Sequence, residues 1–104
     1  MNMTDEPIII TNIERSGNGA LVSMEVGRED IPEDQVTFNI QIDDDYYEEI
    51  TEGAVDVETF AELAMQYMMR HADKTDFPHD FDLETIAVAY DDFDTVMREQ
   101  IAKQ

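Results

Sequence analysis

Three stretches in the first half of the chain alternate apolar and polar positions, as strands with one buried face do. The clearest stretch is residues 36–43, where apolar residues at even positions alternate with polar residues at odd positions. Residues 8–15 are rich in β-branched side chains, and residues 20–26 alternate again. Between the last two lies the sequence Ser16-Gly17-Asn18-Gly19, whose glycines and asparagine accept positive φ angles. The pattern predicts a β-hairpin followed by a third strand.

The strongest helical pattern runs from Val57 to Ala72, where apolar residues recur at spacings of three and four along one face. Asp56 stands at the N-cap position, and Glu58 adds negative charge where the helix dipole favours it. Phe77-Pro78 ends the helical region, because the residue before a proline is pushed out of helical geometry. The inner face consists of Val57, Phe60, Ala61, Ala64, Tyr67, Met68, His71 and Ala72.

A second helix is predicted from Leu83 to Ala102, with Asp82 as its N-cap. Residues 85–90 also have enough β-branched character for a strand, in which case Asp91 or Asp92 would cap a shorter helix that begins near Phe93. We prefer one long helix, because residues 82–84 repeat the acid–apolar–acid opening of the first helix. Its inner face would be Leu83, Ile86, Ala87, Tyr90, Phe93, Met97 and Ile101.

The remaining segments show no clear periodicity of apolar and polar residues. Residues 28–35 are polar with a central proline and are typical of a loop, and residues 43–53 fit a loop, a fourth strand or an extra helical turn equally well. A chain of 104 residues has the length of one domain. The predicted fold is therefore a single α+β domain over residues 1–104, in the order β-β-β-α-α: a small antiparallel sheet of three or four strands with two C-terminal helices packed on one face.

The net charge of the chain bears most strongly on its possible functions. Lys and Arg together number 6 against 26 Asp and Glu, which gives a formal net charge of −20. Such a balance argues against direct binding to nucleic acid or to an anionic membrane, since both depend on Lys and Arg. The absence of cysteine excludes disulfides and thiol chemistry. Residues 1–7 lack the basic and apolar regions of a signal peptide, and no apolar run has membrane-spanning length, so we expect a cytoplasmic location.

No pattern of catalytic residues is present. Ser16 and Ser23 are the only serines, neither lies in a nucleophile-elbow context, and no glycine-rich phosphate loop occurs. The acidic runs lack the alternating ligands and central glycine of an EF-hand. We therefore expect neither catalysis nor a cofactor, with a weak divalent-metal site as one alternative. That alternative would use Asp76, His79, Asp80 and Asp82.

The acidity itself has three interpretations: a well-solvated surface, an adaptation to high salt, or a surface that binds a basic partner. We favour the last one, a non-catalytic interaction protein whose carboxylates steer and pair with arginines while tyrosines supply contact area. Its most concrete form is a nucleic-acid mimic that inhibits a nucleic-acid-binding protein, as a phage-type accessory protein would by analogy. The predicted partner-binding residues are Asp43, Asp44, Asp45, Tyr46, Tyr47, Glu48, Glu49, Glu52, Asp91, Asp92 and Asp94.

A second alternative uses the methionines of the first predicted helix. Met65 and Met69 lie on its flank, which indicates more apolar surface than one sheet covers. A homodimer, or an acidic oligomeric chaperone or structural module, would use this surface. His71, near the end of the same helix, is interpreted as a structural residue favoured by the helix dipole.

Overall fold

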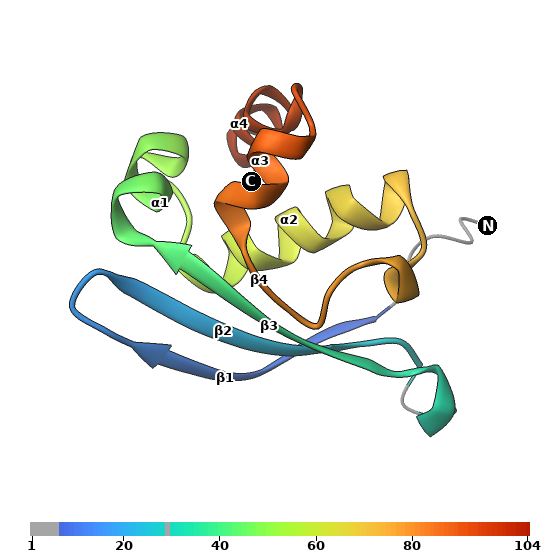
Figure 1. Ribbon diagram of the computed structural model, residues 1–104. Coiled ribbons are helices and arrows are strands. Elements are labelled where there is room, and N and C mark those ends of the chain that lie inside the picture. The colour runs from blue at the N-terminus through green and yellow to red at the C-terminus, as the bar shows by residue number, and fades with distance from the viewer. Residues whose placement is uncertain (1–6, 29) are drawn as a thin grey trace.

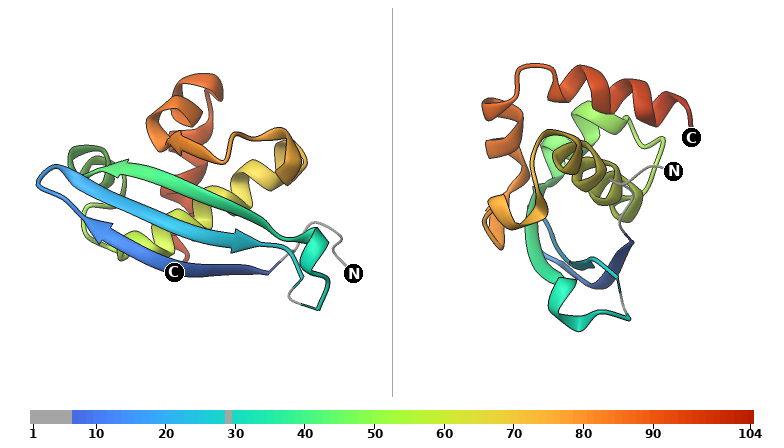
Figure 2. Two further views of the ribbon diagram at one scale, coloured as in Figure 1. Left: turned by 60° about the horizontal axis from the view of Figure 1, so that its bottom comes forward. Right: turned by 90° about the vertical axis from the view of Figure 1, so that its right-hand side faces the viewer.

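Four strands form one sheet, and the α-helices gather on one face of it (Figures 1 and 2). The computed structural model describes residues 7–28 and 30–104. The interpretation of residues 1–7 above therefore lies, apart from Pro7, outside the described residues. The strands are β1 (Ile8–Arg15), β2 (Gly19–Val26), β3 (Val36–Asp43) and β4 (Asp80–Asp82). The helices are α1 (Asp44–Thr51), α2 (Val57–His71), α3 (Leu83–Ala89) and α4 (Phe93–Ala102), with short 3₁₀ helices η1 (Pro32–Asp34) and η2 (Lys74–Asp76).

The α+β fold class and the three predicted strands are confirmed, with one irregularity inside β1. The sheet order is β1-β2-β3-β4, and both β1–β2 and β2–β3 are antiparallel. The β1–β2 register shifts between Ile10 and Asn12, so that Ile10 pairs with Met24 and Ile13 pairs with Val22. This bulge keeps both isoleucines on the side of the buried β2 residues, although their spacing of three breaks strict alternation.

β4 makes the sheet mixed, which the sequence did not predict. It pairs in parallel with β3, so that Ile40 lies opposite Phe81 and Gln41 opposite Asp82. The backbone N–H of Asn39 also donates to the His79 carbonyl at 2.7 Å. With only three residues, β4 is too short to show an alternating pattern, and its position follows from pairing with β3.

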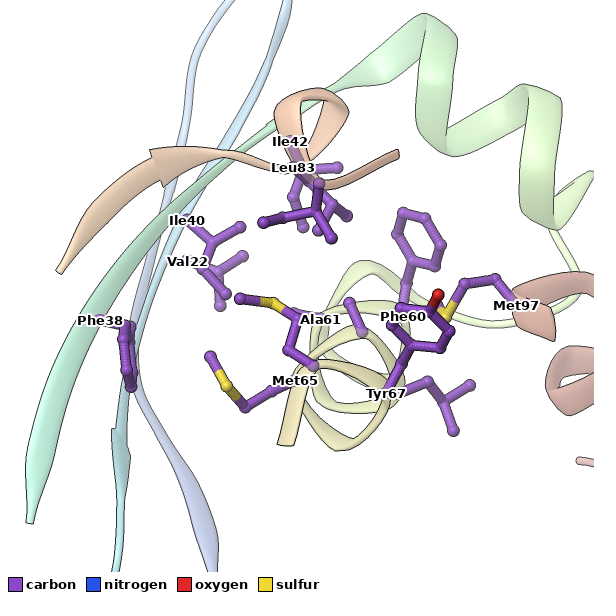
Figure 3. Close-up of a cluster of buried hydrophobic side chains, with 14 of the residues drawn as sticks. Val22, Phe38, Ile40, Ile42, Phe60, Ala61, Met65, Tyr67, Leu83 and Met97 are labelled. Carbon is purple, nitrogen blue, oxygen red and sulfur yellow. The ribbon is translucent and has the colours of Figure 1, made fainter. Parts of the chain in front are cut away.

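α2 is the central element of the core, as its pattern predicts, and the Asp56 side chain accepts from the Thr59 N–H at 2.9 Å. The helix lies between the sheet and α4. In Figure 3, Met65 and Ala61 extend toward the sheet residues, whereas Tyr67 lies near Met97 of α4. The buried residues of α2 are Val57, Phe60, Ala61, Leu63, Ala64, Met65, Tyr67, Met68 and Met69.

The prediction of one long C-terminal helix is wrong. The chain leaves helical geometry at Tyr90, with φ −120° and ψ 107°, and α4 begins at Phe93 with Asp92 as N-cap. The alternative start near Phe93 is thus correct, although residues 85–89 are helical and do not form a strand. The break changes the chain direction between α3 and α4 (Figure 2). α3 therefore packs on the sheet and α4 on α1 and α2, which a straight helix would not do.

Of the three structures that fit residues 43–53, the chain adopts the helical one, and α1 occupies residues 44–51. The Asp44 N–H donates to the carbonyl of Asn18 in the β1–β2 turn at 2.8 Å, so the hairpin satisfies a free N–H of the first turn. The helix ends at Thr51, and the C-cap Glu52 and Gly53 follow with φ 51° and φ 79°. Glycine adopts such a positive φ without steric cost, and the chain turns there toward α2.

Candidate functional site

The solvent-facing side of α1 consists of carboxylates alone. Tyr46 and Ile50 are buried and Tyr47 is half-buried, so the sequence Asp-Asp-Tyr-Tyr-Glu-Glu-Ile-Thr places its apolar residues on one helical face. No cation of the described residues forms an ion pair with this helix. The exposed acidic residues, including the C-cap, are Asp44, Asp45, Glu48, Glu49 and Glu52.

The two tyrosines predicted to supply contact area are used inside the protein. The Tyr46 hydroxyl donates to Oδ1 of Asp94 at 2.5 Å, and the Tyr47 hydroxyl donates to the carbonyl of Val55. Burial and the Asp94 carboxylate raise the pKa of Tyr46 above its ordinary value. Both rings also pack against Phe60, with centroid separations of 6.2 Å for Tyr46 and 5.8 Å for Tyr47. The side chains that α1 presents to solvent are therefore its carboxylates and not its tyrosine rings.

A second group of acids, which sequence reasoning missed as part of the site, joins α1 through the sheet. Because β3 and β4 are parallel, both end at the same edge, and α1 and α3 both begin there (Figure 1). Desolvation and the nearby carboxylates of Asp82, Asp43, Glu49 and Asp45 raise the pKa of Glu84 on α3. No sequence signal identified Glu84, because its proximity to α1 depends on β4.

Carboxylates of α1, of the β4–α3 junction and of the first turn of α4 lie together at one end of the molecule. We call this end the acidic end. Asp94 belongs to it through the hydrogen bond with Tyr46. Asp92 lies instead against α2, where it accepts from the Tyr67 hydroxyl, and Asp91 is exposed in the α3–α4 turn. The acidic end consists of Asp43, Asp44, Asp45, Glu48, Glu49, Glu52, Asp82, Glu84 and Asp94.

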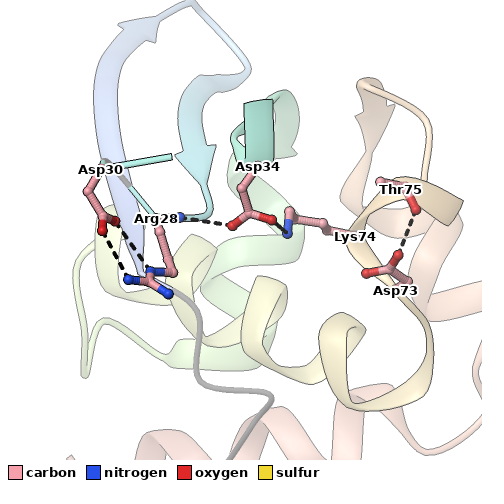
Figure 4. A network of polar contacts seen from close by, with 6 residues as sticks. All are labelled: Arg28, Asp30, Asp34, Asp73, Lys74 and Thr75. Carbon is pink, nitrogen blue, oxygen red and sulfur yellow. Dashed lines mark hydrogen bonds and ion pairs between the residues drawn. The ribbon is translucent and has the colours of Figure 1, made fainter. Parts of the chain in front are cut away.

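The ion pairs within the described residues lie at the opposite end of the molecule, around η1 and η2 (Figure 4). Arg28 pairs with Asp30 at 2.9 Å, and buried Lys74 pairs with Asp34 at 3.1 Å. The backbone N–H of Arg28, followed by the Lys74 ammonium, holds the pKa of Asp34 below its ordinary value. Among the residues that the structure describes, ion pairs therefore compensate part of the charge at one end and none of it at the other.

Two hollows flank the acidic end. One, of about 350 Å³, is lined by Gly17, Asn18 and the three aspartates at positions 43–45. The other, of about 320 Å³, lies beside α3. We call it the Val88 groove; it is lined by Asp82, Glu84, Thr85 and Val88.

The alternative metal site is not assembled. Asp80 accepts from the Asn39 side chain at 2.7 Å, and Asp82 accepts from the Glu84 N–H at 3.0 Å. The His79 ring lies 6.0 Å from that of Phe38. Between residues 7 and 104, Glu29 apart, no three His, Asp or Glu side chains lie in an arrangement that could hold a metal ion.

The apolar surface of α2 exceeds what the sheet covers, as predicted, but the expectation that this excess lies on an open flank is wrong. Met65 is fully buried and Met69 is 8% exposed, because α2 is covered from more than one side. A chaperone or dimer surface made of these methionines is thus not available on the folded chain. His71 accordingly has structural contacts: its Nδ1 lies 3.0 Å from the Tyr67 carbonyl, and its ring lies 4.3 Å from that of Tyr67.

No protein-family model, curated protein or solved structure matches this chain. Within the described part of the chain, none of the helices combines the length and the apolar character needed to cross a bilayer.

Proposed function

We propose that this protein binds a basic surface of another protein through its acidic end, and that its partner is a nucleic-acid-binding protein whose site it occupies. One observation carries the proposal: carboxylates from α1, from the β4–α3 junction and from α4 meet at one end, where the described residues form no ion pair. Opposite charges on a partner would gain both steering and pairing there.

The charge density of α1 supports the mimicry of a nucleic-acid strand. Its exposed acids at positions 44, 45, 48, 49 and 52 repeat along an axis that rises about 1.5 Å per residue, or roughly one charge per 3 Å. A single strand of B-DNA carries about one charge per 3.4 Å. A protein groove that accepts a phosphate backbone thus meets a similar density of negative charge on α1.

The intramolecular cost of these charges also supports a binding role. Asp44–Glu48 and Asp45–Glu49 are like-charge pairs four residues apart, an arrangement that destabilises a helix. α1 is held by Tyr46 and Ile50 in spite of this repulsion. A basic partner would relieve the repulsion on binding, which adds to the affinity.

The experiment compares two variants that lose the same formal charge. One is Glu48→Gln with Glu49→Gln and Glu52→Gln in α1, and its control is Glu14→Gln with Glu33→Gln and Glu99→Gln at exposed sites elsewhere. Each protein is immobilised, loaded with bacterial lysate at about 50 mM salt and eluted toward about 500 mM, where screening is strong.

We expect the native protein and the control to retain a nucleic-acid-binding protein that double-stranded DNA displaces, and the α1 variant to lose it. Equal retention by all three proteins would show that the charge acts generically, and would overturn the proposal.

A further inference from the structure

Val88 is the most exposed large apolar residue of the described chain. It is 82% exposed on α3, whereas the next such residue, Ile31, is 36% exposed and lies in the loop before η1, at the opposite end. The Val88 groove places this side chain beside two carboxylates of the acidic end. A largely uncovered apolar side chain thus borders two carboxylates of the acidic end.

The polar atoms that the groove leaves open to a ligand are all hydrogen-bond acceptors. The Thr85 hydroxyl already donates to the Asp82 carbonyl at 2.5 Å, and one Asp82 carboxylate oxygen accepts from the Glu84 N–H at 3.0 Å. The Glu84 carboxylate has neither a hydrogen-bond donor nor a cation among the described residues. What the groove offers a ligand is therefore acceptor oxygens and an apolar surface.

That combination matches an arginine side chain. Guanidinium has five N–H donors and no acceptor, and its planar fork suits carboxylate oxygens. Its methylene stem packs on apolar surface while the charged head pairs elsewhere. Lysine shares the charge, but its ammonium is more strongly hydrated and lacks the fork, so it gains less from a half-apolar groove.

We propose that the Val88 groove receives an arginine side chain of the basic partner, with the guanidinium at Asp82 and Glu84 and the stem on Val88. The inference rests on the proposed function and makes it more specific. α1 then attracts the partner by charge, whereas the groove selects partners that present an arginine beside the contacted surface.

The test titrates isotope-labelled protein with tetra-arginine and, separately, with tetra-lysine at about 50 mM NaCl. The variant is Val88→Ser, and the matched control is Ile31→Ser at the opposite end of the molecule. Because Val88 is so exposed and serine has similar helix propensity, the variant retains the fold, which circular dichroism checks.

We expect tetra-arginine to shift the Val88 methyl and the Glu84 and Thr85 amide resonances, and Val88→Ser to raise its dissociation constant about 3- to 10-fold. Ile31→Ser should leave that constant unchanged, and tetra-lysine should be insensitive to Val88→Ser. Unchanged arginine binding in Val88→Ser, or equal losses for both peptides, would overturn the groove inference. The proposed function fails separately, if the α1 variant retains the partner.

Discussion

At the scale of single residues, Lys74 shows how the protein uses one of its few cations. It is 6% exposed on η2, and its ammonium contacts Oδ1 of Asp34 from η1, while Oδ2 of Asp34 accepts from the backbone N–H of Arg28. One carboxylate thereby joins two loops that are 40 residues apart in the sequence. The contact, drawn in Figure 4, holds η1 and η2 together.

We predict that Lys74→Met raises the pKa of Asp34 toward its ordinary value. The pKa should remain partly lowered, because the Arg28 N–H is the larger cause and is retained. Since the folded-state pKa is lowered, Asp34 stabilises the fold above the ordinary carboxyl pKa, and this stabilisation is lost as the pH falls through the folded value. The variant should therefore lose less stability on acidification.

NMR titration of the Asp34 carboxyl measures the pKa shift, and Lys103→Met is the exposed control. An unchanged Asp34 pKa in Lys74→Met would contradict the assignment.

At the scale of elements, α4 is oriented by two tyrosines from different helices. Tyr46 of α1 donates to Asp94, and Tyr67 of α2 donates to Asp92. Burial and the Asp92 carboxylate raise the pKa of Tyr67 above its ordinary value. These contacts hold the first turn of α4 beside α1 and α2, which explains why the helix that begins at Leu83 does not continue.

We predict that Tyr46→Phe and Tyr67→Phe each lower the free energy of unfolding by about 1–2 kcal/mol, because each removes a hydrogen bond to a charged acceptor. Tyr90→Phe is the control, since Tyr90 is half-buried and its hydroxyl has no hydrogen bond to a described residue. Urea denaturation measures all three. A loss in Tyr90→Phe as large as in the other two would mean that the hydrogen bonds to Asp94 and Asp92 are not the cause of the loss.

We predict that the removal of carboxylates from α1 has opposite effects on stability and on partner binding. The triple variant Glu48→Gln, Glu49→Gln and Glu52→Gln removes like-charge neighbours and should stabilise the protein by about 0.5–1 kcal/mol at low salt, while it weakens partner binding. The gain should be larger than in the variant that carries the same change at Glu14, Glu33 and Glu99. Thermal denaturation at about 10 mM NaCl measures it, and equal stabilisation of both variants would show that α1 is not a centre of repulsion.

At the scale of the whole molecule, the main property is the net negative charge. With a charge of −20 and ion pairs confined to one end of the described chain, the folded state carries strong self-repulsion. We predict that the melting temperature rises as NaCl increases from about 10 mM to about 500 mM, because the screening length shortens from about 30 Å to a few ångströms. A flat or falling melting temperature would indicate that the carboxylates are already paired.

Local patterns in the sequence determined the three long strands, the hairpin, α2 and its Asp56 cap. Each depends on periodicity or on a turn sequence, and both act over a few residues. The acidic composition of residues 43–52 and 91–94 predicted a binding surface, and the structure brings Asp94 of that set beside α1.

Only the tertiary structure decided how these parts meet. β4 exists because three residues pair with β3, α1 begins where the Asn18 carbonyl accepts its N–H, and the chain breaks after α3 because α4 is held by tyrosines of α1 and α2. These contacts join residues distant in sequence, so no local pattern records them. Glu84 enters the acidic end, and Met65 and Met69 leave the surface, for the same reason: burial and proximity are set by packing between elements.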